Sequence, residues 1–250
     1  MPEIKTIDDV IQTLQNIVKE SKLKTSTLGY FAALYLKVTL KVKQGIAEDF
    51  FDDGLRMEKL DIIFAKRYIN AYYDFQAQKE ITDAWKKAFN LSEKFWPIVL
   101  QHLLIGMNAH INLDLGIAAY EVTKGSNILN LKNDFNKINS ILSSLVTDVE
   151  NDLSTIYPFL KKILKLTSKF DNFLVDFSME IARDGAWDFA VRLANSNQND
   201  IQELINTRDK NVTETALLIT NPGIIANIIF SIVRLSEKGS TAQKINDLTK

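Results

Sequence analysis

Apolar residues recur along most of the chain at intervals of three and four, which is the spacing of one face of an α-helix. The alternation of apolar and polar positions that marks a half-buried strand is nearly absent. Pro97, Pro158 and Pro222 each stand where a helix could begin, because the first helical position tolerates proline. The pattern therefore predicts an all-α protein.

Breaks in this pattern divide the chain into about ten helices. The expected helices cover residues 7–21, 27–43, 55–78, a short stretch after 82, 97–122, 131–151, a start near 158, 170–195, and both sides of 221–223. Gly125-Ser126-Asn127 is the best candidate for a boundary, but it is too short to separate mobile domains. We expect one multi-helix bundle over residues 1–240 around a long central helix at about 97–122, with residues 241–250 frayed.

Composition narrows the function classes. Hydrophobic residues make up 46% and charged residues 24% of the 250 positions, an ordinary globular balance. A net charge of −1 provides no field that would attract nucleic acid. The chain has no cysteine, which excludes disulfides and thiolate metal sites and is compatible with a reducing compartment. No secretory signal begins the chain, so we expect a soluble, cytoplasmic protein.

Two segments, Phe95–Leu113 and Thr215–Val233, each run for 19 residues without a charged side chain. The first contains several polar residues and the second is interrupted by Pro222, and unpaired polar groups are costly in lipid. Both segments are therefore expected to be buried helices rather than transmembrane segments.

The helix expected at 97–122 carries both histidines of the chain. At about 100° per residue, its residues form three stripes. The stripes are His102, Gly106, Ala109, Leu113 and Gly116, then Gln101, Asn108 and Asn112, and finally His110 with Asp114. The small residues of the first stripe would let a neighbouring helix approach closely. Because the polar residues do not gather on one solvated face, at least one polar stripe points into the protein.

Buried polar groups must be hydrogen-bonded, since each one left unpaired costs about 1–3 kcal/mol. We therefore expect His110, Asn112 and Asp114 to be buried in a polar network. In the functional interpretation, His110 is an acid/base or the ligand of one divalent metal, and Asp114 lies beside it. In the structural interpretation, the network only fixes the register of the helices.

Two other helices could contribute charge to the same site. Arg67 follows an apolar run and could hold Asp114 or an anionic substrate, or it could form an exposed pair with Asp74 on its own helix. Glu180 and Arg183 could join the site, or they could belong to a solvated stripe of charges with internal ion pairs.

Several chemistries lack a motif. No Glu-x-x-His pair, phosphate-binding loop, dinucleotide fingerprint or Gly-x-Ser-x-Gly turn is present. The cofactor is therefore unknown: a single divalent metal at His110 and Asp114 stays open, as does heme through His102 or His110. The oligomeric state is open as well.

The run from Gln101 to Ala119, QHLLIGMNAHINLDLGIAA, resembles the signature of a bacterial, all-helical domain family of unknown function. Flanking matches are residues 60–68 and 82–89, Asp134-Phe135, and Arg183 with Trp187, so the resemblance covers roughly residues 50–195. It implies that His102, Asn108, His110, Asn112 and Asp114 belong together, and it brings no established activity.

These observations favour an enzyme that acts on a small, partly apolar molecule. The expected catalytic residues are His110, Asp114, Arg67, Glu180 and Arg183, and the expected substrate-binding residues are His102, Asn108, Asn112, Tyr68, Trp85 and Trp187. Aromatic side chains would shape the pocket: Phe64, Tyr68, Trp85, Phe89 and Trp96. The alternative is a non-catalytic ligand- or protein-binding module with a purely structural polar core. A cavity that touches His110 would favour the enzyme hypothesis. A sealed, fully hydrogen-bonded His110 would favour the binding-module hypothesis.

Overall fold

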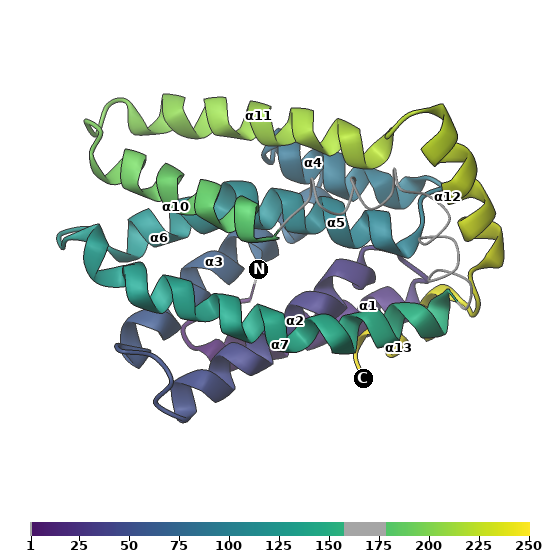
Figure 1. Ribbon diagram of the computed structural model, residues 1–250, viewed down its shortest axis with the longest axis horizontal. Coiled ribbons are helices and arrows are strands. Elements are labelled where there is room, and N and C mark those ends of the chain that lie inside the picture. Colours follow the sequence, from purple (N-terminus) through teal and green to yellow (C-terminus); the bar gives the residue numbers. More distant parts are fainter. Residues whose placement is uncertain (1, 158–178) are drawn as a thin grey trace.

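The computed structural model describes residues 2–157 and 179–250, and the regular elements within them are helices, which confirms the all-α class (Figure 1). The α-helices are α1 (Ile7–Leu23), α2 (Gly29–Ala47), α3 (Gly54–Gln76), α4 (Asp83–Asn90), α5 (Val99–Ala109), α6 (Gly116–Val122), α7 (Lys132–Ile156), α10 (Met179–Ala194), α11 (Ile201–Thr220), α12 (Ile224–Ser236) and α13 (Thr241–Leu248). Short 3₁₀ turns cover Leu91–Glu93 and Ile128–Leu131. The helix expected near Pro158 and the first part of the one expected at 170–195 lie outside the described residues.

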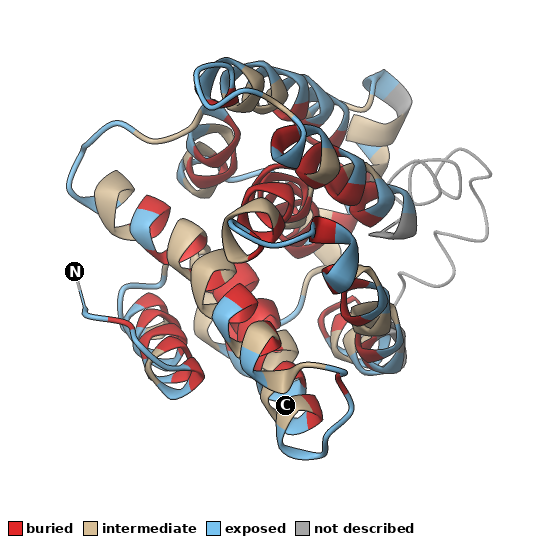
Figure 2. Ribbon diagram, turned by 90° about the vertical axis from the view of Figure 1, so that its left-hand side faces the viewer, coloured by how far each residue is buried: buried red, intermediate tan, exposed pale blue. Residues whose placement is uncertain are grey.

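The helical run in the middle of the molecule consists of α5, a π-helical segment His110–Leu115 (the π segment) and α6. It begins at Val99, two residues after the expected start, and the side chain of Gln101 accepts a hydrogen bond from the backbone of Ile98 at 3.1 Å. Figure 1 places this run between α10 and α11 on one side and α2 and α7 on the other. Its residues are mostly buried, as the red ribbon in the interior of Figure 2 indicates.

The π segment changes the phase of the helix, and the expected stripe of small residues therefore serves two neighbours. A Cβ atom on Gly106 would lie 2.5 Å from the Phe31 ring of α2, and one on Gly116 would lie 2.7 Å from the carbonyl oxygen of Ala186 on α10. Each glycine thus lets a different helix approach closely. Such π turns inside α-helices occur frequently at functional sites.

The structure differs from the sequence expectation at the C-terminus, where residues 241–250 were expected to fray. Ser240 caps α13, accepting a hydrogen bond from the Gln243 backbone at 3.2 Å while the Gln243 side chain accepts one from Ser240 at 2.7 Å. Ile245 and Leu248 are buried, and Lys244 forms an ion pair with Glu237. This cap and this apolar face order the helix.

The two uncharged segments differ in burial. The first, Phe95–Leu113, is buried from Ile98 to Leu104, as expected. The second is split between α11 and α12, and α12 exposes four large apolar side chains, so the expectation that it is buried is wrong. These side chains are Ile224, Ile228, Ile232 and Leu235. Among the described residues, no helix has the length and apolar character needed to cross a membrane.

Candidate functional site

A carboxylate at the end of the π segment connects three helical elements. Asp114 Oδ1 accepts a hydrogen bond from Nε of Arg67 on α3 at 2.6 Å, and its Oδ2 accepts one from Nε1 of Trp85 on α4 at 2.8 Å. Nδ1 of His110 lies 3.3 Å from the same Oδ2. Asp114 is only 1% exposed, so these contacts replace water around a buried charge.

The protonation states follow from this arrangement. Burial by itself would raise the pKa of Asp114, but the Arg67 charge and the bonds from His110 and Trp85 hold it below 3.8. Burial lowers the pKa of His110 below 6.5, although Asp114 acts in the opposite direction. At neutral pH Asp114 is therefore ionised and His110 is neutral. Because an ionised carboxylate only accepts hydrogen bonds, Nδ1 of His110 carries the proton and Nε2 has the free lone pair.

His110 Nε2 is buried and has no hydrogen-bond partner, in contrast to Nδ1. The imidazole stacks on the ring of Phe64 with 3.6 Å between the ring centroids and meets the Tyr35 ring edge-on at 4.5 Å. Phe31 and Tyr68 contact the imidazole at longer range. Packing on several sides fixes the orientation of the ring, while its basic nitrogen stays unused.

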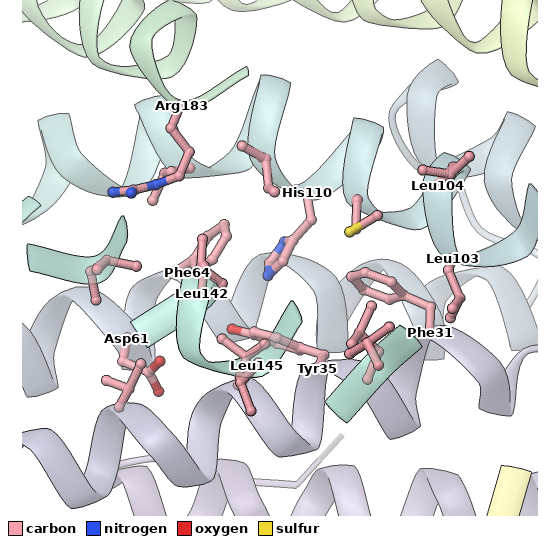
Figure 3. Close-up of a pocket in the computed structure, with 18 of the residues that line it drawn as sticks. Phe31, Tyr35, Asp61, Phe64, Leu103, Leu104, His110, Leu142, Leu145 and Arg183 are labelled. Atoms are coloured by element: carbon pink, nitrogen blue, oxygen red, sulfur yellow. The ribbon is translucent and has the colours of Figure 1, made fainter. Parts of the chain in front are cut away.

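An apolar cavity of about 270 Å³ adjoins this nitrogen (Figure 3). It is lined by α2, α3, α5, the π segment, α7 and α10, and most of its wall is aliphatic. The polar or charged lining residues are Tyr35, Asp61, His110, Glu150 and Arg183. A volume of this size exceeds the roughly 150 Å³ of an engineered apolar cavity that holds benzene, so a small organic molecule fits.

Three further polar atoms of this wall are buried without a hydrogen-bond partner: the Tyr35 hydroxyl, Oδ2 of Asp61 and Nε of Arg183. Burial, together with the charge of Glu58, raises the pKa of Asp61 to about 7. Burial also raises the pKa of Tyr35 well above 10. Buried polar atoms in proteins normally have partners, so this cluster of unpaired atoms is typical of a site that receives a ligand.

Arg183 enters the cavity from α10 and is 2% exposed, so the interpretation of a solvated stripe is wrong for this residue (Figure 3). Its guanidinium donates hydrogen bonds to Oδ1 of Asn139 and to the carbonyl oxygen of Phe135, and it lies 4.8 Å from the Phe135 ring. These partners are neutral, and burial lowers the pKa of Arg183 to about 10. The side chain of Glu180 lies outside the described part of the structure.

A second hollow of about 390 Å³ lies on the other side of Asp114 and is lined mainly by polar side chains. Arg67, Trp85 and Asp114 line it together with Asn70, Asp74, Glu80 and others, whereas His110 belongs to the apolar cavity. Arg67 thus bonds Asp114 rather than Asp74, which pairs with Lys79 at 3.3 Å. The polar network separates the apolar cavity from a more open, charged depression.

Other residues of the sequence prediction lie away from the apolar cavity. His102 packs against Tyr30, and Asn108 donates to the carbonyl oxygen of Val212 on α11. Asn112, expected to be buried, is partly exposed and donates to Asn108. His102 and Asn108 thus contact other helices, Asn112 bonds within the central run, and none of the three lines the cavity.

The remaining expected residues contribute packing or lie elsewhere. Tyr68 is fully buried beside Trp85, and Trp187 packs against Phe135 with 5.0 Å between ring centroids. Trp96 is 55% exposed, so it does not shape the pocket, and Phe89 stacks on Trp85 instead. Asp134, part of the resemblance, accepts hydrogen bonds from Arg56 at 2.9 Å and from the backbone amides of Asp52 at 2.6 Å and Asp53 at 3.1 Å, just before α3.

In the described parts of the chain, no three His, Asp or Glu side chains lie close enough together to hold a metal ion. His110 and Asp114 therefore have no third protein ligand of this kind there, and Asp114 is already occupied by Arg67 and Trp85.

Comparison with known proteins agrees with the resemblance seen in the sequence. The model of a family of unknown function (DUF5995) matches residues 7–222. The chain belongs to this family. No curated protein and no solved structure matches it.

The DUF5995 match extends well beyond the residues 50–195 that the resemblance covered. It begins at α1 and includes α2, so every residue that lines the apolar cavity falls inside the family region, whereas α12 and α13 lie beyond it. The cavity is therefore part of the DUF5995 domain itself.

Sequence reasoning missed Tyr35 and Asp61 as cavity residues. A signal was available for Asp61, because it stands at helical spacing among Met57, Leu60 and Ala65 on the apolar face of α3. Burial of a carboxylate on an apolar helix face destabilises the fold unless the group has a functional or structural role there. Tyr35 gave a weaker signal, since a tyrosine in an apolar run is usually part of the core.

Proposed function

We propose that this chain binds a small, largely apolar molecule in the cavity and transfers a proton on it, with His110 as the general base. The observation that carries the proposal is the state of the two imidazole nitrogens. Nδ1 faces an ionised Asp114, and Nε2 borders the cavity without a partner. A carboxylate that holds one nitrogen of a histidine stabilises the imidazolium formed when the other nitrogen takes a proton.

Asp61 supplies an acid for the same reaction. With a pKa of about 7, its carboxyl group is protonated in a large fraction of molecules at neutral pH, whereas His110 is neutral and basic. In acid–base enzymes, the surroundings of two titratable groups in one site often shift their pKa values so that one group acts as the acid and the other as the base. The mostly aliphatic wall selects substrates with a largely apolar body, and it supports isomerisation or elimination on such a molecule.

Proton transfer can be followed without knowing the substrate. The protein would be incubated in D₂O with an extract of apolar small molecules, and mass spectrometry would detect compounds that gain deuterium or change in mass. We expect the wild type to label or convert a small set of compounds and His110→Gln to lose this activity, since glutamine cannot act as a base. Melting curves must show that the variant is folded.

His102→Gln is the matched control, because it makes the same change in the other buried histidine, away from the cavity. It should keep the activity. If His110→Gln labels the same compounds as the wild type, the catalytic role is wrong. If it still binds them without converting anything, and the wild type also converts nothing, the alternative of a non-catalytic binding module is favoured.

A further inference from the structure

Arg183 presents a positive charge to the apolar cavity without a counter-charge among the described residues. The described hydrogen bonds of its guanidinium go to the neutral acceptors of Asn139 and Phe135, and Asp184, whose charge acts on it, is exposed. Its two described hydrogen bonds leave Nε–H unused, and that atom is buried. Burying an unpaired cation is costly, so a ligand that brings a negative group to this point would be strongly stabilised.

The cavity is elongated, and Arg183 stands at one end of it. Along the central run its wall extends from Leu100 to Leu115, which at about 1.5 Å per residue is roughly 20 Å. In Figure 3, Arg183 lies at the opposite end of the view from Leu103 and Leu104. The wall on α7 runs along the same axis. It starts at Phe135, whose carbonyl oxygen accepts a hydrogen bond from Arg183, and ends at Leu153.

We propose that the cavity binds a straight-chain aliphatic monocarboxylate, with the carboxylate at the guanidinium of Arg183 and the chain along α5 and α7. This inference rests on the proposed function, because it names the chemical class of the apolar molecule. A planar carboxylate matches the fork of a guanidinium that still has free N–H groups. Among the described lining residues, Glu150 on the α7 wall carries a negative charge, which would disfavour the reverse orientation.

Asp61 fits the same ligand. Its carboxyl group, with the pKa raised by burial, can stay protonated, and Oδ2 lacks a partner. A neutral carboxyl can donate a hydrogen bond where an ionised one would repel the ligand. In Figure 3, Asp61 and Arg183 are drawn on opposite walls, with Phe64 and Leu142 between them in the view. The polar end thus offers a cation and a neutral acid, and the remaining wall accommodates the hydrocarbon.

The test measures dissociation constants of the full chain for octanoate, decanoate and dodecanoate, and for the 1-alkanols of the same lengths, by calorimetry. Each added methylene should lower Kd about fourfold until the cavity is full. Each carboxylate should bind roughly tenfold or more tightly than its alcohol, because only the acid brings a negative charge and two acceptor oxygens to the guanidinium. Equal affinities for acids and alcohols in the wild type would overturn the assignment of the carboxylate.

Variants separate the head group from the chain. Arg183→Met should raise Kd for the acids to near the level of the alcohols and change Kd for the alcohols far less. The variant is expected to fold, because buried charges are often replaced by apolar residues without loss of folding. Arg192→Met, at an exposed position of the same helix, should change neither series. If Arg183→Met keeps the preference for acids, Arg183 is not the partner. If no acid or alcohol binds the wild type, the apolar-ligand function itself fails, which is a different result from the loss of head-group preference.

Discussion

Asp114→Ala is expected to destabilise the fold through the donors that it leaves behind. Trp85 is 2% and His110 3% exposed, so their N–H groups would lose their acceptor where water cannot replace it. Each such loss costs about 1–3 kcal/mol. The Arg67 side chain is 25% exposed and can turn to solvent, so its contribution is about 0–1 kcal/mol. We expect a loss of about 2–4 kcal/mol in the free energy of unfolding, since neighbouring contributions do not add fully.

Urea denaturation at pH 7 measures this loss, and Asp74→Ala is the control. Asp74 also has a basic partner, Lys79, but that pair is on the surface, so the control should shift stability by no more than about 0.5 kcal/mol. Trp85→Phe removes the indole donor. Trp85→Phe should therefore lower the free energy of unfolding less in the Asp114→Ala background than in the wild type. A double-mutant cycle gives this difference.

The effect also has a pH signature. The pKa of Asp114 is lowered in the folded protein, so its stabilisation is present above the unfolded value of 3.8 and is lost as the pH falls through the lower folded value. Below pH 3.8 the gap in stability between the wild type and Asp114→Ala should narrow as Asp114 becomes protonated. A change smaller than about 0.5 kcal/mol at pH 7, or the same cost for Trp85→Phe in both backgrounds, would refute the argument from orphaned donors.

Two further predictions concern the cavity wall and the helix contacts. The pKa of Asp61 is raised to about 7, so the stability gained from its protonation is fully present below pH 3.8 and is lost as the pH rises through 7. Asp61→Asn should remove this decline in the free energy of unfolding, which is on the order of 4 kcal/mol between the two pH values. Parallel curves of stability against pH for the wild type and the variant would contradict this prediction. Gly106→Ala should destabilise the fold by about 1–3 kcal/mol in thermal melts, because the new Cβ would lie 2.5 Å from the Phe31 ring. Gly185→Ala is its control: the nearest atom is the flexible end of Arg208 at 3.4 Å, so better helix propensity should raise stability by up to about 1 kcal/mol. If Gly106→Ala and Gly185→Ala change stability equally, helix propensity rather than contact with α2 determines the effect at Gly106.

The helical class, the long central run and the polar residues on it were readable from local pattern. Periodicity reports which face of a helix is buried, and His110 and Asp114 are four positions apart on a run otherwise rich in apolar residues. Arg67 as a partner for Asp114 was also foreseen, because a buried carboxylate needs a donor and an arginine after an apolar run is a natural source.

The cavity and its chemistry depended on contacts between segments far apart in the chain. No local pattern could separate Arg183 in a cavity from an arginine on a solvated stripe, because only the packing of α10 against α7 decides it. The same holds for Asn108 and His102, which share a helix with His110 but join other helices. The π segment adds a further reason: it shifts the helix phase between Gly106 and Gly116, so a stripe drawn at a constant 100° per residue assigns them to one neighbour where the structure has two. The sequence by itself thus determined the helical class and the burial of His110 and Asp114 on the central run. The tertiary structure alone decided which of them face the cavity, because burial is a property of one helix face whereas a cavity is formed by several helices together.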